Sequence, residues 1–251
     1  MNTSVNTHPV ALITGGAQRI GAAIAEQLHH VGYNTVIHYR HSQKPAVALV
    51  ENLNQRRADS AVCFSADLND ITAIQTLTEK SLAHWGRINA LINNASAFYP
   101  TPIGSATEND WDTLIASNMK APFFLAQALA PELKKQSGCI INIADIYAEK
   151  PLIKHTIYCM AKAGNVMLTK SLALELAPAV RVNGIAPGAI LWPTTQDSDS
   201  QKKQEKILAD IPLQRTGDTN DIARTVLFLL RDAPYITGQI FNVDGGRSLQ
   251  Y

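Results

Sequence analysis

Short, continuous apolar runs alternate along the chain with longer stretches that have helical periodicity. Seven such runs occur, at 10–14, 35–39, 61–66, 88–94, 139–143, 180–186 and 236–243. Strands that are apolar on both faces are typical of a parallel sheet covered by helices on both sides. The alternation therefore predicts an α/β fold in which crossover helices connect parallel strands.

The stretches between these runs predict the helices. The clearest helical segments span about 22–31, 44–57, 71–85, 110–133 and 158–176. Pro122 is expected to kink the fourth segment or to begin its second half. The composition of the polar segment 193–206 favours a solvated loop, and its place after the sixth run also allows a substrate lid over about 190–210.

Composition limits the class of protein. The chain has 251 residues, a formal net charge of +1, 46% hydrophobic and 17% charged residues. These values predict one folded domain over 1–251, because disorder requires low hydrophobicity and high net charge. The near-neutral charge argues against a nucleic-acid surface, and no apolar run approaches the roughly 20 residues that cross a membrane.

The cysteines and the first residues bear on the compartment. Residues 1–8 lack the basic and apolar regions of a secretory signal and are expected to be a flexible terminus. Cys63, Cys139 and Cys159 are odd in number and widely spaced, so they predict a reducing cytoplasm rather than a disulfide framework. No set of His, Cys and Asp has the spacing of metal ligands, and no metal site is expected.

A glycine-rich turn lies between the first apolar run and the first helix. It contains Gly15, Gly16 and Gly21 in the segment GGAQRIG. Glycines let the backbone approach a pyrophosphate closely, and the N-terminus of the following helix offers unpaired N–H groups. This position at a strand–helix junction predicts a dinucleotide site.

The end of the second run indicates which dinucleotide binds. NAD-binding chains carry an acidic residue about 20 residues after the glycines, where it binds the ribose hydroxyls. This chain has Tyr39, Arg40, His41 and Ser42 there. Arg40 can pair with a 2′-phosphate and Ser42 can donate to it, which favours NADP(H). The alternative is that Arg40 is an ordinary surface arginine.

Tyr158 and Lys162 lie one helical turn apart, on the same face of the predicted helix. A free tyrosine has a pKa of about 10 and is a weak acid catalyst at neutral pH. A neighbouring ammonium stabilises the phenolate and lowers that pKa. Tyr158 is therefore a candidate general acid that protonates a substrate as it receives hydride.

Together these features resemble the short-chain dehydrogenase/reductase family. The matching residues, in family order, are Thr14-Gly15, Gly21, Asn93-Asn94-Ala95, Asn118, Tyr158, Lys162 and Pro187-Gly188. The resemblance extends from about Val10 to Ser248 and implies a single Rossmann-type three-layer domain with a seven-stranded parallel sheet. It also implies that Tyr158 donates the proton, Lys162 holds the ribose hydroxyls and lowers the tyrosine pKa, and Asn118 holds a water.

The same resemblance implies a cofactor-binding set drawn from several strand ends, with Asp67 against the adenine. The set is Thr14, Gly15, Arg19, Ile20, Gly21, Tyr39, Arg40, His41, Ser42, Asp67, Leu68, Asn94, Ala95, Ser96, Lys162, Pro187 and Gly188.

Two positions depart from the usual family pattern. Arg19 stands where the family usually has its middle glycine, and Asp145 lies at or next to the position of the usual serine. A serine there donates to a substrate carbonyl, whereas an ionised aspartate only accepts hydrogen bonds. Burial can also raise the pKa of Asp145, so that it donates a proton. Either role suits a nitrogen heterocycle better than a simple ketone.

Both departures resemble the pteridine reductase branch, which reduces pterins and folates with NADPH. The resemblance implies that Phe98 stacks on the pterin, Ser96 lies near the cofactor and the pterin edge, and Arg19 serves cofactor and substrate. Asp145, Tyr158, Lys162 and Asn118 then form the catalytic set, and Arg19, Ser96, Phe98, Asp145 and Tyr158 bind the substrate. A flat aromatic substrate gains from stacking on an aromatic side chain.

Two alternatives remain at this stage. One is a reductase of the same family acting on a carbonyl, such as a 3-oxoacyl thioester, and the other is an NADP-binding protein without catalysis.

The resemblance also implies a homotetramer that packs the two long helices against neighbours. The C-terminal tail 245–251 is a candidate to reach a neighbour's active site.

Overall fold

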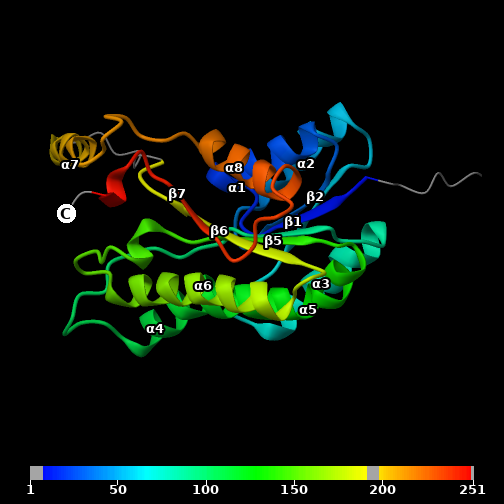
Figure 1. Cartoon of the computed structure of the whole chain (residues 1–251), viewed down its shortest axis with the longest axis horizontal. Coiled ribbons are helices and arrows are strands. Elements are labelled where there is room, and N and C mark those ends of the chain that lie inside the picture. Colours follow the sequence, from blue (N-terminus) through cyan, green and yellow to red (C-terminus); the bar gives the residue numbers. More distant parts are fainter. Residues whose placement is uncertain (1–7, 191–197, 250–251) are drawn as a thin grey trace, which may run out of the picture.

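The computed structural model describes residues 8–190 and 198–249, which form a parallel sheet between two layers of helices (Figure 1). The expected flexible terminus lies outside this description except for His8. The strands are β1 (Val10–Ile13), β2 (Asn34–Tyr39), β3 (Ala61–Ser65), β4 (Ala90–Asn93), β5 (Cys139–Ile143), β6 (Arg181–Pro187) and β7 (Ile240–Val243). The single α/β domain and the seven-stranded parallel sheet are confirmed.

The strand order is β3-β2-β1-β4-β5-β6-β7, with every pair parallel. The chain builds outward from β1 in one direction and then returns to place β4 on its other side. Ligands of such sheets bind outside the carboxyl ends of the strands where the order reverses. The fold therefore directs attention to the ends of β1 and β4.

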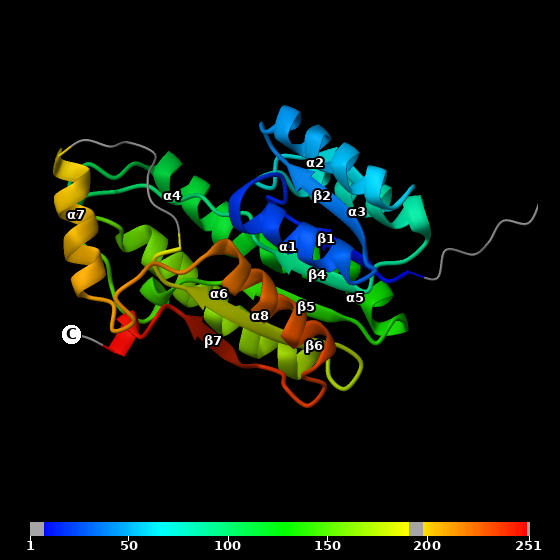
Figure 2. The same ribbon diagram turned by 90° about the horizontal axis from the view of Figure 1, so that it is seen from above.

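Helices cover both faces of the sheet (Figures 1 and 2). On one face lie α1 (Arg19–His30), α2 (Gln43–Arg56) and α8 (Thr219–Arg231), and on the other lie α3 (Ile71–Trp85), α4 (Glu108–Ile115), α5 (Ala121–Lys135) and α6 (Thr156–Glu175). Two short 3₁₀ turns, η2 (Ile146–Ala148) and η3 (Arg247–Leu249), follow β5 and β7. No helix of the described residues is long and apolar enough to cross a membrane.

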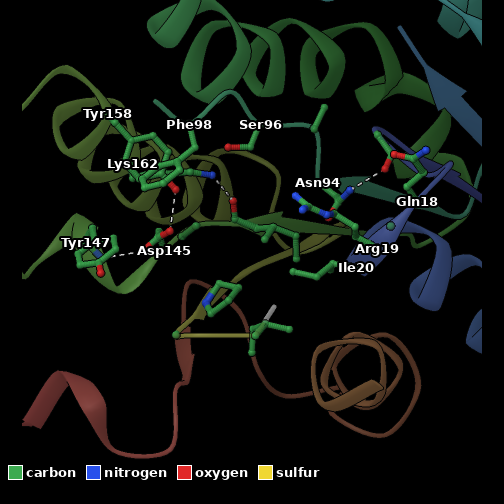
Figure 3. Close-up of a pocket in the computed structure, with 18 of the residues that line it drawn as sticks. Gln18, Arg19, Ile20, Asn94, Ser96, Phe98, Asp145, Tyr147, Tyr158 and Lys162 are labelled. Atoms are coloured by element: carbon green, nitrogen blue, oxygen red, sulfur yellow. Dashed lines mark hydrogen bonds between the residues drawn. The ribbon is translucent and has the colours of Figure 1, made fainter. Parts of the chain in front are cut away.

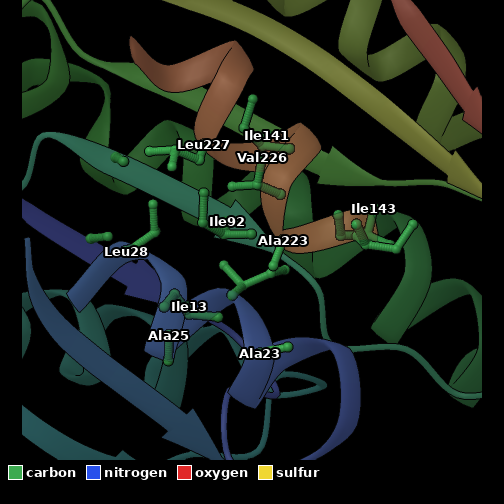
Figure 4. Close-up of a cluster of buried hydrophobic side chains, with 14 of the residues drawn as sticks. Ile13, Ala23, Ala25, Leu28, Ile92, Ile141, Ile143, Ala223, Val226 and Leu227 are labelled. Atoms are coloured by element: carbon green, nitrogen blue, oxygen red, sulfur yellow. The ribbon is translucent and has the colours of Figure 1, made fainter. Parts of the chain in front are cut away.

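Strand residues alternate between two buried cores. Ile13 and Ile92 face the core shared with Leu28 of α1 and Val226 of α8 (Figure 4). Their neighbour Leu12 faces the opposite core, beneath α5 and α6. Because successive strand side chains point to opposite faces, a strand with both faces buried has a continuous apolar sequence.

The predicted helix over 110–133 is one helical rod with an irregular middle. A π-helical segment, η1 (Ala116–Lys120), joins α4 to α5. Pro122 then occupies the first turn of α5, where its missing N–H is not needed. The prediction that Pro122 begins the second half is confirmed, and the irregular backbone falls on the π segment that holds Asn118.

The polar segment after β6 differs from the sequence prediction. Residues 198–209 form α7 (Ser198–Ala209), so the expectation of a solvated loop over 193–206 is wrong for its described part. The Gln, Lys and Glu residues of this segment are strong helix formers, which explains the outcome. Residues 191–197 of the expected lid lie outside the described residues, while Ile190 and Ile207 line the cavity described below.

Helix α8 was not among the predicted helices, although its sequence contains a capping motif and helical apolar spacing. Asp218 caps it, and Asp218 and Asp221 form a reciprocal capping box. Its buried face includes Ile222, Val226 and Leu229, at helical spacing. The seventh strand is also shorter than predicted and begins at Ile240 rather than at 236.

Candidate active site

A cavity of about 590 Å³ opens at the carboxyl ends of the strands, around the β1–β4 crossover (Figure 3). Its size is within the range of small-molecule sites. Most of the residues predicted for the site line it: Gly15, Arg19, Ile20, Gly21, Tyr39, Arg40, Ser42, Asn94, Ala95, Ser96, Phe98, Asp145, Tyr158, Lys162, Pro187 and Gly188.

The glycine-rich turn is shaped by close backbone contacts. Gly15 has a φ of +59°, and a Cβ on it would lie 3.0 Å from the Cα of Ala95. A Cβ on Gly21 would collide with the carbonyl oxygen of Gly15 and lie 2.8 Å from the Cα of Gly16. Glycine at these positions lets the N-terminus of α1 approach the turn, which leaves a cradle of backbone N–H groups for a pyrophosphate.

Arg19 adopts a conformation that glycine would favour. Its φ is +53°, and its exposed side chain forms no ion pair within the described chain. A left-handed backbone costs an L-residue roughly 1–2 kcal/mol. The arginine thus occupies the usual glycine position at an energetic cost, and its side chain lines the cavity.

Asn94 and Thr14 fix the turn to β4. Asn94 Nδ2 donates to the carbonyl oxygens of Thr14 at 2.9 Å and Gly15 at 3.0 Å. Thr14 Oγ1 accepts from the N–H groups of Asn94 at 2.9 Å and Ala95 at 3.0 Å. Thr14 is buried and does not line the cavity, so within this structure its side chain supports the turn from behind.

His38 is a supporting residue that the sequence analysis missed. Its Nδ1 accepts from the Gly15 N–H at 3.1 Å, and its Nε2 lies 3.1 Å from the carbonyl oxygen of Ala66. These contacts require a neutral ring with the proton on Nε2. Burial lowers the pKa of His38 and so favours that neutral form. The hydrogen bond to Ala66 and the charge of Asp67 oppose this shift. A histidine within an apolar strand gave no sequence signal for this role.

Arg40 and Asp67 form an ion pair at the edge of the cavity. The Arg40 guanidinium lies 2.9 Å from the Asp67 carboxylate, and both side chains are about half exposed. An exposed pair of this kind contributes little to stability, so a competing phosphate can replace the carboxylate. Asp67 itself does not line the cavity, and neither do His41 and Leu68, which were also predicted to contact the cofactor.

Asp145, Tyr158 and Lys162 meet at the inner end of the cavity (Figure 3). Tyr158 Oη donates to Asp145 Oδ2 at 2.6 Å, and the N–H of Tyr147 donates to Asp145 Oδ1 at 2.9 Å. Lys162 Nζ donates to the carbonyl oxygen of Ile143 at 2.8 Å and lies 5.7 Å from the centre of the Tyr158 ring. Both oxygens of Asp145 are thus committed to acceptor roles.

Burial controls the protonation of this group. It raises the pKa of Tyr158, and the adjacent Asp145 carboxylate raises it further. Burial also raises the pKa of Asp145, although the hydrogen bonds from Tyr158 and Tyr147 lower it in part. For Lys162, burial lowers the pKa to about 8. The expectation that Lys162 lowers the Tyr158 pKa is therefore not met in this structure, where Tyr158 is a protonated donor.

Phe98 forms an aromatic wall beside Tyr158. Its ring packs edge-on against Tyr158, with ring centres 4.8 Å apart and planes at 74°. His155 stacks against it at 4.8 Å with planes 15° apart. Phe98 nevertheless remains 54% exposed and lines the cavity, which leaves apolar surface available to a flat ligand.

Asn118 is deeply buried behind Ser96. The Ser96 hydroxyl donates to Asn118 Oδ1 at 2.6 Å, and Asn118 Nδ2 donates to the carbonyl oxygens of Ala97 and Leu114 at 2.9 Å each. Its own carbonyl oxygen accepts from Asn165 at 2.9 Å. Asn118 does not line the cavity. It lies in the π-helical segment η1, and such segments are frequent at functional sites. Its proposed hold on a water remains a prediction.

The cavity also contains residues outside the predicted set of site residues, although Ile190 and Ile207 lie within the expected lid over about 190–210. Tyr147, Ile190, Ile207 and Arg247 line it. Tyr147 follows Asp145 by two positions, but the others come from segments whose place depends on the tertiary fold. Arg247 lies in the cavity of its own chain, whereas the C-terminal tail was expected to reach a neighbour. Within the described residues no three His, Cys, Asp or Glu side chains are placed to hold a metal.

Comparison with known proteins identifies relatives over almost the whole chain. The model of a family described as enoyl-(acyl carrier protein) reductase matches residues 15–248. Pteridine reductase 1 of Leishmania tarentolae is 37% identical over 288 residues, covering 98% of this chain and 99% of the relative. The 3-oxoacyl-(acyl-carrier-protein) reductase FabG of Staphylococcus aureus is also 37% identical, over 239 residues, covering 94% and 96%.

The strain at Arg19 leads to a stability prediction. Replacing Arg19 with Gly should raise the free energy of unfolding by about 1 kcal/mol, because the relieved strain exceeds the roughly 0.4–1 kcal/mol that glycine adds to unfolded-chain entropy. Urea denaturation of the protein alone measures this change. Arg19→Ala, which keeps the left-handed strain, should bring no gain, and a loss of stability in Arg19→Gly would contradict the strain argument.

Proposed function

The chain belongs to the short-chain dehydrogenase/reductase family of oxidoreductases, and from this premise we propose that it is an NADPH-dependent pteridine reductase. The observation that carries the proposal is the hydrogen-bonded pair of Asp145 and Tyr158 beside the aromatic wall of Phe98. The proposed substrates are pterins, dihydropterins and dihydrofolate. A carboxylate can accept from the ring and amino N–H groups of such heterocycles, whereas it repels a carbonyl oxygen.

The residues present fit a dinucleotide. The cradle between Gly15 and Gly21 would be filled by a Cβ at either position, so it suits a closely approaching pyrophosphate. At the end of β2, Arg40 is available through its exposed ion pair, and Ser42 begins α2 without using its hydroxyl as a cap. A cation and a free hydroxyl at the N-terminus of a helix favour the 2′-phosphate of NADPH over NADH.

The side chains then divide the work of reduction. Bound NADPH supplies the hydride, which a ring carbon of the pterin receives. Tyr158 holds a proton on Oη, which it donates to Asp145 in this structure and would turn toward the neighbouring ring nitrogen of a bound pterin. Asp145 orients the N–H edge as an acceptor, and the proton that Tyr158 gives up is proposed to be resupplied through Lys162 and water. Lys162 holds a positive charge within this group and, by the family resemblance, the ribose hydroxyls.

Phe98 is proposed to hold the flat ring from one side. Aromatic rings prefer offset or edge-to-face contacts, and Phe98 already makes an edge-to-face contact with Tyr158. A pterin between this wall and the cofactor would place its ring carbon close to the hydride donor, as hydride transfer requires. Arg19 and Ser96, which also line the cavity, are proposed to contact the pterin and the cofactor.

The second candidate is a reductase of 3-oxoacyl thioesters. It is favoured by the FabG relative, whose identity to this chain equals that of the pteridine reductase. Asp145 argues against it, because an ionised carboxylate cannot donate to a carbonyl. The third candidate, an NADP-binding protein without catalysis, is disfavoured by the complete set of Asn118, Tyr158 and Lys162.

We also propose that the chain forms a homotetramer in the cytoplasm. Exposed apolar side chains lie on α5 and α6, including Phe123, Met160, Met167 and Leu174. Exposed apolar side chains on these helices would be buried by a neighbouring subunit in a tetramer. The three free cysteines are compatible with a reducing compartment.

The substrate class can be tested with one substitution. The wild-type protein should oxidise NADPH in the presence of dihydrobiopterin or dihydrofolate. Asp145→Ser should lower kcat with dihydrobiopterin about 100-fold or more, because a proton-transfer group is removed, and should raise turnover of acetoacetyl-CoA. Wild-type turnover of acetoacetyl-CoA without turnover of any pterin would favour the thioester reductase instead.

The stacking role of Phe98 has a separate test. Phe98→Ala should weaken dihydrobiopterin binding roughly tenfold, because stacking and buried area are lost, while NADPH affinity should stay within about twofold. Equilibrium titrations, monitored by tyrosine and tryptophan fluorescence, measure the affinities for dihydrobiopterin and for NADPH. Phe228→Ala, at an exposed position on α8, is the matched control. Equal loss of both ligands in Phe98→Ala would refute the stacking role.

Cofactor choice depends on Arg40. Arg40→Ala should weaken NADPH binding by about 10- to 100-fold and leave NADH binding nearly unchanged, because only NADPH carries the 2′-phosphate. Isothermal titration calorimetry at fixed ionic strength measures both affinities. Arg56→Ala, an exposed arginine at the end of α2, controls for the general loss of one charge. An equal effect on NADPH and NADH would contradict this assignment.

A further inference from the structure

Four basic side chains line the cavity, and one of them has no part in the reaction described above. Arg19 and Arg40 lie at the cofactor end, and Lys162 lies behind Tyr158. Arg247 lies beside Tyr147, which is on the Asp145 side of the cavity and away from Arg19 (Figure 3). Arg247 is thus a cation at the part of the cavity that a substrate's substituent would reach.

The backbone around Arg247 is firmly held. The Asp244 carboxylate accepts from the N–H of Gly246 at 2.9 Å and from the N–H of Ser248 at 2.7 Å. These bonds close the turn between β7 and η3, in which Gly245 and Gly246 have φ of +66° and +86°. The position of Arg247 is therefore set by the fold rather than by a chance contact of a surface chain.

The side chain of Arg247 is held by an aromatic ring and not by an acid. Its guanidinium carbon lies 5.8 Å from the centre of the Tyr147 ring. It forms no ion pair with a carboxylate of the described chain. The Tyr147 hydroxyl also shares a hydrogen bond with Arg247, and the remaining N–H groups of the guanidinium match the two oxygens of a carboxylate.

The surroundings favour an anionic ligand group. Ile190 and Ile207 provide apolar lining in the same cavity, and a charge interaction within it is less screened than in water. Asp145, the acidic residue that lines the cavity, is occupied by Tyr158 and the N–H of Tyr147. The charge of Arg247 acts on Asp145 through space without forming an ion pair with it in the described chain, so the guanidinium stays open to an anionic group of a ligand.

We propose that Arg247 and Tyr147 form a subsite for a carboxylate carried on the substituent of the pterin, so that substrates with an acidic tail bind better than those with a neutral one. This inference rests on the proposed pteridine reductase function. It assigns dihydrofolate, whose ring bears a benzoylglutamate tail, to the preferred substrate class over dihydrobiopterin, whose side chain is neutral.

The test compares these two substrates in matched variants. Arg247→Gln should raise the KM for dihydrofolate about tenfold and change the KM for dihydrobiopterin less than twofold, with kcat similar for both. Arg247→Lys, which keeps the charge but loses the two-pronged geometry, should recover part of the loss. Arg215→Gln removes an exposed arginine paired with Asp221 outside this cavity and should change neither KM.

A binding measurement separates this inference from the proposed function. Calorimetric titration of folate and of biopterin into the protein with NADP⁺ should show the same selective loss in Arg247→Gln, and higher salt should narrow the difference. Parallel changes for both ligands, or no change for either, would overturn the subsite. Absence of turnover with selective folate binding intact would refute the reductase function and leave the carboxylate subsite standing.

Discussion

The hydrogen bonds between the ends of β1 and β4 are the constraint on which the site depends. Thr14 and Asn94 exchange hydrogen bonds across these strand ends, and His38 of β2 accepts a further bond from the N–H of Gly15. Three strands thus hold one turn of backbone in a shape that only small residues allow at Gly15 and Gly21. The protein's own hydrogen bonds therefore fix the cradle, and a loop held in this way lowers the entropic cost of binding.

Burial determines the protonation of the three proposed catalytic side chains, Asp145, Tyr158 and Lys162. In water an aspartate and a tyrosine would differ widely in acidity, and a lysine would remain charged. Here burial raises the pKa of both Asp145 and Tyr158 and lowers the pKa of Lys162 to about 8. The affinities of the three groups for a proton are shifted while the groups remain in close proximity. Burial thus keeps the proton on Tyr158 Oη, with Asp145 as the acceptor beside it.

The sequence predicted the elements whose cause is local. Continuous apolar runs located the strands, and the glycines with Asn94 located the turn, because strand ends and the turn that follows them are adjacent in the chain. His38 and Arg247 were missed because their partners, Gly15 and Tyr147, come from distant segments. The Tyr158 pKa was also misjudged, since spacing places Lys162 nearby but does not reveal burial or the contact with Asp145.

The choice of substrate within this fold comes down to individual side chains. Equal identity to a pteridine reductase and to a 3-oxoacyl reductase means that the shared fold cannot separate the two chemistries. Asp145 can separate them, because a buried acceptor has a cost unless a ligand or a neighbour donates to it. Tyr158 meets that need in the protein alone. When Tyr158 turns its proton toward the substrate, Asp145 Oδ2 loses its hydrogen-bond donor. An N–H group on the edge of a pterin can replace that donor, whereas a carbonyl group has no proton to donate.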